Sequence, residues 1–247
     1  MLRSLIMAFS TYSRIPMPRI EWDEKNKRYV LLFFPFVGLV TGLLLFLASY
    51  VCSVAHLNTF FTGAVLCAVS ILVNGGIHMD GFADTVDALS SMADEKKRLE
   101  ILKDPHCGSF AAVMSGVYLL LLAGAFSQAG LYRFPGIIPV FVISRALSAL
   151  SLIFFKHSNE NGMAAGFAQA LPKNGSVAFL ILLILSGSVV MCVHNPVGGI
   201  GAILAALIFY TYYGFFATDN FGGVNGDTSG FFLQVCELIM IVAYCIL

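Results

Sequence analysis

The chain has 247 residues, of which 58% are hydrophobic and 11% are charged. Soluble domains carry about 25% charged residues, so this chain has less than half of the charge that a water-exposed surface requires. This composition excludes an ordinary soluble domain and predicts a protein of the lipid bilayer. The formal net charge is zero, with 14 basic and 14 acidic residues, which gives no electrostatic basis for binding nucleic acid.

A short apolar stretch opens the chain, and longer apolar runs follow it. Residues 1–15 lack a signal-peptide cleavage site, so we expect an amphipathic segment at the membrane interface. A helix needs about 20 mostly apolar residues to cross the bilayer core. Such runs lie near residues 30–55, 57–77, 108–129, 133–155, 176–194, 197–217 and 231–247. None alternates as barrel strands do, so the sequence predicts an all-α, polytopic membrane bundle of about seven transmembrane helices. No repeat or linker divides it, and we expect one integral membrane domain over residues 1–247.

The basic residues are distributed unevenly between the two sides of this bundle. Six precede the first run, four lie between the second and third runs, and two lie between the fourth and fifth. Only Arg133 lies in a loop on the opposite side. By the positive-inside rule, the N-terminus and the even-numbered loops are predicted to face the cytoplasm from the cytoplasmic membrane. Segments 78–107 and 218–230 are therefore expected on the same side.

Three carboxylates follow the second apolar run. Asp80, Asp84 and Asp87 are spaced i, i+4, i+7, so they lie on one stripe of a helix, with no basic residue between them. Close like charges raise each other's pKa unless a cation neutralises them, and hard oxygen donors favour Mg²⁺ or Mn²⁺ over zinc. The alternative is an ordinary solvated helix face, which the apolar and small flanking residues disfavour. His78 precedes the stripe, and either a catalytic role, as a proton acceptor or a partner of a carboxylate, or a place at the interface accounts for it.

The same loop continues with a segment of mixed charge. Ser91 and Asp94 form the capping-box pattern of a helix N-terminus, so we expect a cytoplasmic helix near residues 92–104. Lys103 and Asp104 end this segment where the next run begins. Two interpretations stay open. Either Lys103 contacts a phosphate and Asp104 a metal ion or a ribose hydroxyl, or the pair is a helix-terminal lysine followed by a turn-forming Asp-Pro sequence.

Two charged side chains, Arg145 and Glu237, lie inside apolar runs. A charge in the bilayer is costly unless it is paired or faces a polar cavity, so we expect Arg145 to be the buried partner of an anion. Intramembrane charges also mark substrate pathways in transporters. Because the carboxylates cluster at one membrane face and no inverted repeat is visible, a transporter is the weaker alternative.

Residues 219–230 form a glycine-rich loop before the last run. Gly222, Gly223 and Gly226 allow backbone N–H groups to approach a phosphate, and Asp227 is placed to complete a metal site. Glycine-rich turns also simply join spans. The predicted position on the same side as the aspartate stripe favours the functional interpretation.

The order of these segments resembles the cobalamin synthase family, the adenosylcobinamide-GDP ribazoletransferases, which are integral membrane enzymes of vitamin B12 assembly. The most specific motif is His-x-Asp-Gly-x-x-Asp-x-x-Asp, which begins at His78 and is followed downstream by Lys103-Asp104. The other matching stretches are residues 11–18, 75–77, 98–102, 108–110, 144–145 and 222–227.

The resemblance implies a magnesium-dependent enzyme that joins the two halves of a cobamide. A hydroxyl of α-ribazole, or of its 5′-phosphate, attacks the cobinamide-linked phosphorus of adenosylcobinamide-GDP, and GMP leaves. The proton goes to His78 or to one of the aspartates. The residues assigned to the metal are Asp80, Asp84, Asp87 and Asp227, and those assigned to substrate and phosphate are Arg14, Lys103, Asp104, Arg145, Gly222, Gly223 and Gly226.

The expected partners are these two substrates and the lipid bilayer, and small residues in the spans also permit a homo-oligomer. The remaining alternative is another Asp-rich membrane phosphotransferase or prenyltransferase, such as the CDP-alcohol type. Asp80-Gly81 matches the start of that family's motif, but its following Ala-Arg pair and its later Gly-x-x-x-Asp-x-x-x-Asp stretch are absent from this sequence.

Overall fold

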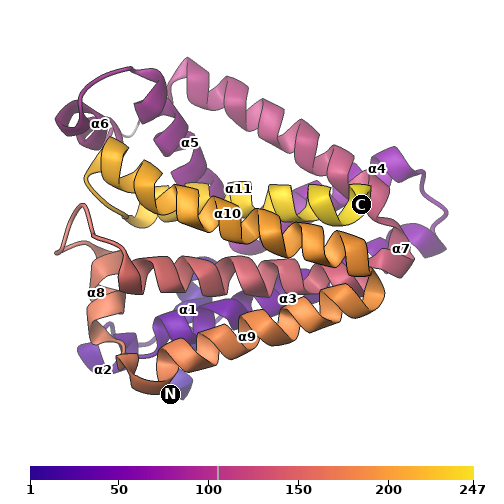
Figure 1. Ribbon diagram of the computed structural model, residues 1–247, viewed down its shortest axis with the longest axis horizontal. Coiled ribbons are helices and arrows are strands. Elements are labelled where there is room, and N and C mark those ends of the chain that lie inside the picture. The colour runs from indigo at the N-terminus through magenta and orange to yellow at the C-terminus, as the bar shows by residue number, and fades with distance from the viewer. Residues whose placement is uncertain (105) are drawn as a thin grey trace.

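The computed structural model describes residues 1–104 and 106–247, and this part of the chain forms eleven helices and no strand (Figure 1). The helices are α1 (Leu2–Tyr12), α2 (Glu24–Lys27), α3 (Val30–Val54), α4 (Thr59–Asn74), α5 (Ile77–Ser90), α6 (Glu95–Ile101), α7 (Ser109–Phe154), α8 (Met163–Ala170), α9 (Lys173–His194), α10 (Pro196–Phe221) and α11 (Gly226–Ile246). The all-α architecture predicted from the sequence is confirmed.

Five of the described helices, α3, α7, α9, α10 and α11, are long and apolar enough to cross a membrane, and the bent pair α4–α5 brings the number to six. The sequence predicts seven spans, one more than this count. The two numbers differ because the single 46-residue helix α7 contains two of the predicted apolar runs. Gly130 within it has non-helical angles, φ 56° and ψ 153°, which glycine adopts without steric cost. Figure 1 shows the chain turning back at this point, so α7 consists of two limbs of opposite direction.

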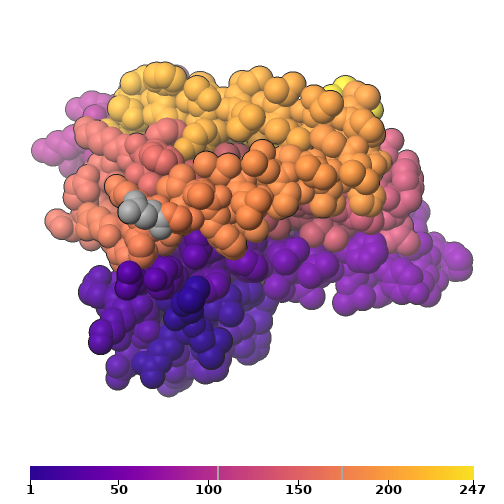
Figure 2. Space-filling view, turned by 60° about the horizontal axis from the view of Figure 1, so that its bottom comes forward, coloured from indigo at the N-terminus to yellow at the C-terminus, as the bar shows by residue number. Residues whose placement is uncertain are grey.

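The second limb of α7 lies at the centre of the bundle. Every residue from Ile143 to Leu152 is buried, and α3, α9 and α11 pack against α7. The outer helices carry the opposite pattern. Large apolar side chains such as Leu185 and Val189 of α9 and Ile208 of α10 are exposed. Figure 2 shows the segments of α9 and α10, in orange, on the outside of the molecule. Such a face requires an apolar solvent, as expected for a multi-pass membrane protein.

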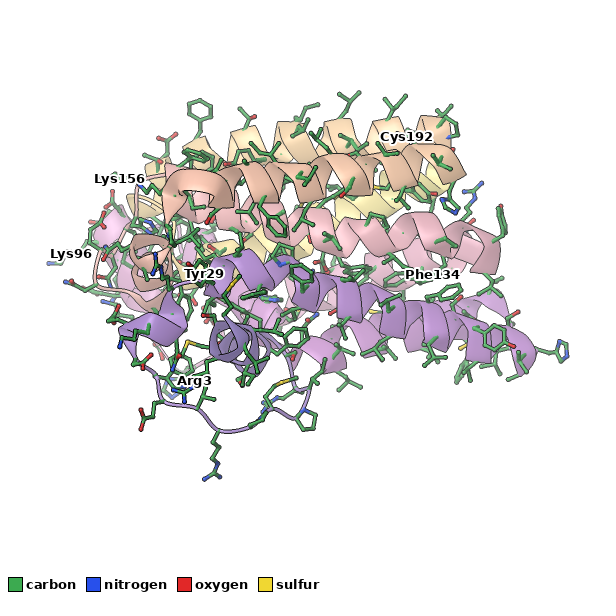
Figure 3. All side chains as sticks on the ribbon, turned by 90° about the horizontal axis from the view of Figure 1, so that it is seen from below. Arg3, Tyr29, Lys96, Phe134, Lys156 and Cys192 are labelled. Atoms are coloured by element: carbon green, nitrogen blue, oxygen red, sulfur yellow. The ribbon has the colours of Figure 1, made fainter. Side chains whose placement is uncertain are left out.

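The two ends of the bundle differ in charge. Lys96 and Lys156 lie at one end, here called the basic end, and Phe134 and Cys192 lie toward the other (Figure 3). Segments 78–107 and 218–230 meet at the basic end, where Arg98 Nη1 donates to Asn220 Oδ1. The prediction that these two segments share one side is therefore confirmed.

The acidic helix α5 begins where α4 ends. The two helices make an angle of 96° at Gly75 and Gly76, whose φ angles are +64° and +78°. Helix α5 therefore runs across the direction of α4. The helix expected near 92–104 is α6, and it is shorter. Its N-cap is Asp94, which accepts from the Lys97 N–H. The expected cap Ser91 instead ends α5, because α5 continues that far.

Candidate active site

Two glycines bring α5 and α11 into close contact. A Cβ atom on Gly81 of α5 would lie 2.9 Å from the Asp227 Cα, and one on Gly230 of α11 would lie 3.2 Å from the Gly81 Cα. Larger residues at these positions would push the helices apart. The first turn of α11, with Asp227, is therefore held against the acidic face of α5.

The four predicted metal ligands lie near enough to one another that the charges of three of them act on the fourth, Asp84. Burial and then the charges of Asp80, Asp227 and Asp87, in that order of importance, together raise the pKa of Asp84 to about 6. Within the described residues, however, no group of three or more His, Cys, Asp or Glu side chains is close enough to hold a metal ion. Mg²⁺ in enzymes usually takes one or two carboxylates, several waters and substrate phosphates, so the donor set fits such an ion.

Asp87 also has a contact of its own. Its carboxylate lies against Gly108, where a Cβ atom would come within 1.8 Å of Oδ1. Gly108 is the N-cap of α7, and a helix N-terminus attracts an anion. A role in stabilising the start of α7 therefore explains the position of Asp87 as well as a role in metal binding does.

Asp80 lies between two hollows of different character. One, the enclosed cavity, has a volume of about 290 Å³, and the other, the open groove, has about 720 Å³ and a wider opening. The polar and aromatic residues that line the enclosed cavity in the described chain are Tyr12, Phe34, His78, Asp80, Ser148, His157, Asn159, Asn225, Asp227 and Ser229. The open groove is lined among others by Ser10, Thr11, Arg14, Gly75, Gly76 and Asp80. Among the described residues, Ile77 and Asp80 are the two that line both, so the two hollows adjoin at the first turn of α5.

His78 is a buried side chain that faces the enclosed cavity. It is 6% exposed, and its Nε2 has no hydrogen-bond partner in the described part of the chain. Its ring packs against Tyr12 and Phe34, with centroid distances of 6.0 and 5.8 Å. Burial, and then the positive charge of Arg145, lower the pKa of His78. The ring is therefore neutral near pH 7 and able to accept a proton or a hydrogen bond.

His157 lines the same cavity, and the sequence analysis missed it. Its Nε2–H donates to the Leu152 carbonyl at 2.9 Å, which leaves Nδ1 of the neutral ring as an acceptor. Nδ1 is buried without a partner among the described residues. The available signal was position alone, because Lys156-His157 ends the fourth apolar run on the side of the aspartates.

Arg14 lies at the open groove, on the other side of α5. Its N–H donates to the Val73 carbonyl at 2.8 Å, and its side chain packs over Gly75, where a Cβ atom would come within 2.5 Å of Cγ. Arg14 is exposed and shares the groove with Asp80. The structure thus brings this residue, predicted to bind substrate, beside the carboxylates.

Lys103 and Asp104 are not brought to either hollow. Both are exposed. Asp104 accepts from the His106 N–H at 3.0 Å and lies 2.6 Å from His106 Nδ1, and these hydrogen bonds lower its pKa. Asp104 thus has a partner within its own segment, which favours a local role over contact with a ligand. Pro105 of the predicted Asp-Pro turn lies outside the described residues.

Arg145 is held by an anion of the chain itself. It is 0% exposed, forms an ion pair with Glu237, and donates from Nη2 to Asn74 Oδ1 at 3.3 Å. Ser144 also donates to Glu237, at 2.9 Å. Arg145 lines neither hollow. The expected buried anion partner is therefore present, and it replaces the phosphate contact that was predicted for this arginine.

The three loop glycines have different roles. The N–H groups of Gly222 and Gly223 donate at 3.0 Å to the carbonyls of Thr218 and Ala217, which closes α10. These two donors are used by the turn, so the predicted phosphate contacts of Gly222 and Gly223 are not supported.

Gly226 differs from the other two because it begins α11 and lines the enclosed cavity. Its N–H forms no hydrogen bond with the described residues. A capping box between Asn225 and Thr228 fixes this first turn. The helix N-terminus, with its positive end of the helix dipole, therefore opens toward the cavity beside Asp227.

Comparison with known proteins identifies relatives over nearly the whole chain. Residues 4–245 match the model of a family described as cobalamin-5-phosphate synthase. An adenosylcobinamide-GDP ribazoletransferase of Lachnoclostridium phytofermentans is 41% identical over 238 residues, which cover 96% of this chain and 91% of that protein. Proteins of the same name from Clostridium botulinum and Acinetobacter baumannii are 27% and 29% identical, over 100% and 98% of this chain and 98% and 96% of theirs. No solved structure matches.

Proposed function

The chain belongs to the cobalamin-5-phosphate synthase family, a family of transferases in cobalamin synthesis, and we propose that it joins adenosylcobinamide-GDP to α-ribazole or α-ribazole 5′-phosphate with release of GMP. The substrates follow from the name of its relatives. The observation that carries the proposal is the position of Asp80, with one hollow on each side and three further carboxylates nearby. Two substrates can meet there. We place the basic end on the cytoplasmic side of the cytoplasmic membrane.

The reaction makes one phosphorus–oxygen bond and breaks another. A ribose hydroxyl attacks the phosphorus attached to cobinamide, and the bond to the bridging oxygen breaks, so that GMP leaves with that oxygen. The hydroxyl proton goes to His78 Nε2, which is buried and unpartnered at the enclosed cavity. Arg14, at the open groove, supplies positive charge to the diphosphate. Phosphoryl transfer requires mainly such positioning and charge neutralisation.

The carboxylates are the residues that would hold a divalent ion. Asp80, Asp84 and Asp227 are the candidates, and Asp87 is the fourth although it also contacts the start of α7. When bound, Mg²⁺ neutralises phosphate oxygens and stabilises the leaving group. The carboxylates would hold the ion at a fixed position, because α5 and the first turn of α11 pack closely against each other at Gly81 and Gly230.

The alternative functions lose support in the structure. The buried charges that suggested a transporter, Arg145 and Glu237, neutralise each other and line neither hollow. Another Asp-rich phosphotransferase would have the same carboxylates. Competition by other nucleotide-linked substrates distinguishes it, since CDP-alcohols should not inhibit this enzyme.

The test is a GMP-release assay with purified protein in liposomes, both substrates and Mg²⁺. We expect Asp80→Asn and Asp84→Asn each to reduce the rate about 100-fold, a typical contribution of a charge-stabilising group. The matched control is Glu100→Gln on α6, an exposed carboxylate at the same end of the bundle, which should stay within about twofold of the wild type. Rates near the wild type in both aspartate variants, or turnover that resists chelation of divalent ions, would contradict the proposal.

A further inference from the structure

The two hollows beside Asp80 differ in size, access and charge, and the two proposed substrates differ in the same properties. We infer that the enclosed cavity binds the base and ribose of the nucleoside acceptor, while the open groove receives the diphosphate of the corrinoid donor. This inference rests on the proposed function and adds to it the placement of each substrate.

Size separates the two sites first. The enclosed cavity, about 290 Å³, lies at the lower end of the roughly 300–1,000 Å³ that small-ligand sites occupy. It accommodates a two-ring heterocycle with a sugar and is too small for a corrin macrocycle. The open groove is larger, about 720 Å³, and continues to the surface, so the bulk of a corrinoid can remain outside it.

Charge separates them next. The residues that line the enclosed cavity include no Lys or Arg within the described chain, and Asp80 and Asp227 are among them. Among the described residues, Asp80 and Asp227 are the charged side chains that a diphosphate would meet there, and both are negative. The open groove contains Arg14. The cavity therefore favours a neutral nucleoside, and the groove favours an anionic donor.

The walls of the enclosed cavity match a nucleoside in detail. The rings of Tyr12, Phe34 and His78 pack together on one side, and aromatic surfaces of this kind stack on flat heterocycles. His157 Nδ1 is a buried acceptor without a partner among the described residues, and a ribose hydroxyl supplies the missing donor. His78 Nε2 offers a second buried site for a hydroxyl.

The place where the two hollows adjoin then brings the reacting atoms together. Ile77 and Asp80 are the residues common to both hollows, and His78 follows Ile77 on the cavity side. A hydroxyl held at His78 therefore lies on the cavity side of Asp80, and a phosphorus in the groove lies on the other side of the same residue.

The experiment is to fill the enclosed cavity at a point away from the carboxylates. Ala165 of α8 is buried and lines the cavity; Ala170 of the same helix does not and gives the matched control. We measure binding of α-ribazole to the purified protein by equilibrium dialysis, and KM for each substrate by GMP release. Ala165→Leu should raise the α-ribazole Kd and KM at least tenfold and leave KM for adenosylcobinamide-GDP within twofold.

Two further variants complete the design. Arg14→Ala should produce the reverse pattern, with only the adenosylcobinamide-GDP KM raised, and Ala170→Leu should change neither constant. His157→Phe, which removes the acceptor at similar volume, replaces Ala165→Leu if that variant does not fold, and should also weaken α-ribazole binding.

The inference is overturned if α-ribazole binding is unchanged in Ala165→Leu and in His157→Phe, or if these variants raise KM for adenosylcobinamide-GDP instead. Failure of the proposed function has a different signature. In that case the wild-type protein binds α-ribazole by dialysis, with the expected loss in Ala165→Leu, and releases no GMP.

Discussion

Two groups of ionised side chains lie in this helical bundle, and they differ in how their charge is balanced. In the middle, Arg145 and Glu237 form an ion pair closed off from solvent. At the basic end, Asp84 has only other carboxylates among the charges that shift its pKa. The two charges of the first group neutralise each other. The second group has no cation among the charges that act on Asp84, and we propose that a divalent ion supplies it. In a protein of the bilayer, balanced charge thus indicates structure and unbalanced charge indicates a binding site.

We expect the largest effect on stability when one partner of the central ion pair is removed. In Glu237→Ala the buried guanidinium of Arg145 loses its anion, which in proteins costs about 3–5 kcal/mol. We expect a large drop in the thermal unfolding midpoint in detergent and a low yield. The double variant Arg145→Met with Glu237→Met should recover most of the loss, because two apolar side chains replace two charges. Equal loss in both proteins would mean that the pair has a role beyond mutual neutralisation.

The acidic group should respond to pH, with a smaller effect. The carboxyl of Asp84 has a pKa of about 6 in the metal-free protein, so a proton competes with Mg²⁺ below that value. We expect Mg²⁺ affinity to fall about tenfold, or about 1.4 kcal/mol, between pH 7.5 and pH 5, as measured by calorimetry.

The pKa of Asp84 also predicts the sign of a stability change. Because it is raised above that of the unfolded chain, the native state binds the extra proton, and the metal-free protein should become less stable as pH rises from about 4 to 6. Asp84→Asn should show neither dependence. If Asp84→Asn still shows the pH dependence of Mg²⁺ affinity and of stability, another titratable side chain is responsible for them.

Removing one carboxylate charge should change the unfolding free energy in opposite directions in the two groups. Asp84→Asn removes one of four repelling charges, so the metal-free protein should gain about 0.5–1 kcal/mol of unfolding free energy, a typical gain where a functional site is strained. Saturating Mg²⁺ should cancel or reverse the gain, because the wild type then has its cation. Thermal unfolding with and without Mg²⁺ measures both. A loss of stability without Mg²⁺ would place Asp84 among the structural charges.

The parts of this arrangement that depend on local spacing could be predicted from the sequence. The i, i+4, i+7 pattern was enough to place three aspartates on α5, and counting spans was enough to bring residues 78–107 and 218–230 to one end. Contacts between distant elements could not be predicted. Nothing local indicates that the anion for Arg145 is Glu237, or that His157 faces the same cavity as His78, because packing of the whole bundle decides both.

Asp104 gives the smallest expected effect and the most direct test of that limit. From the sequence, contact with a metal ion or a ribose hydroxyl is one of two open interpretations for Asp104, whereas metal binding is the favoured one for the aspartates of α5. In the structure it is exposed, and hydrogen bonds from His106 lower its pKa, whereas burial and like charges raise that of Asp84. Asp104→Asn should therefore leave Mg²⁺ affinity and the GMP-release rate within about twofold, as is usual for exposed charges. A tenfold loss of rate at unchanged stability would mean that Asp104 contacts the substrate during catalysis and belongs to the acidic site.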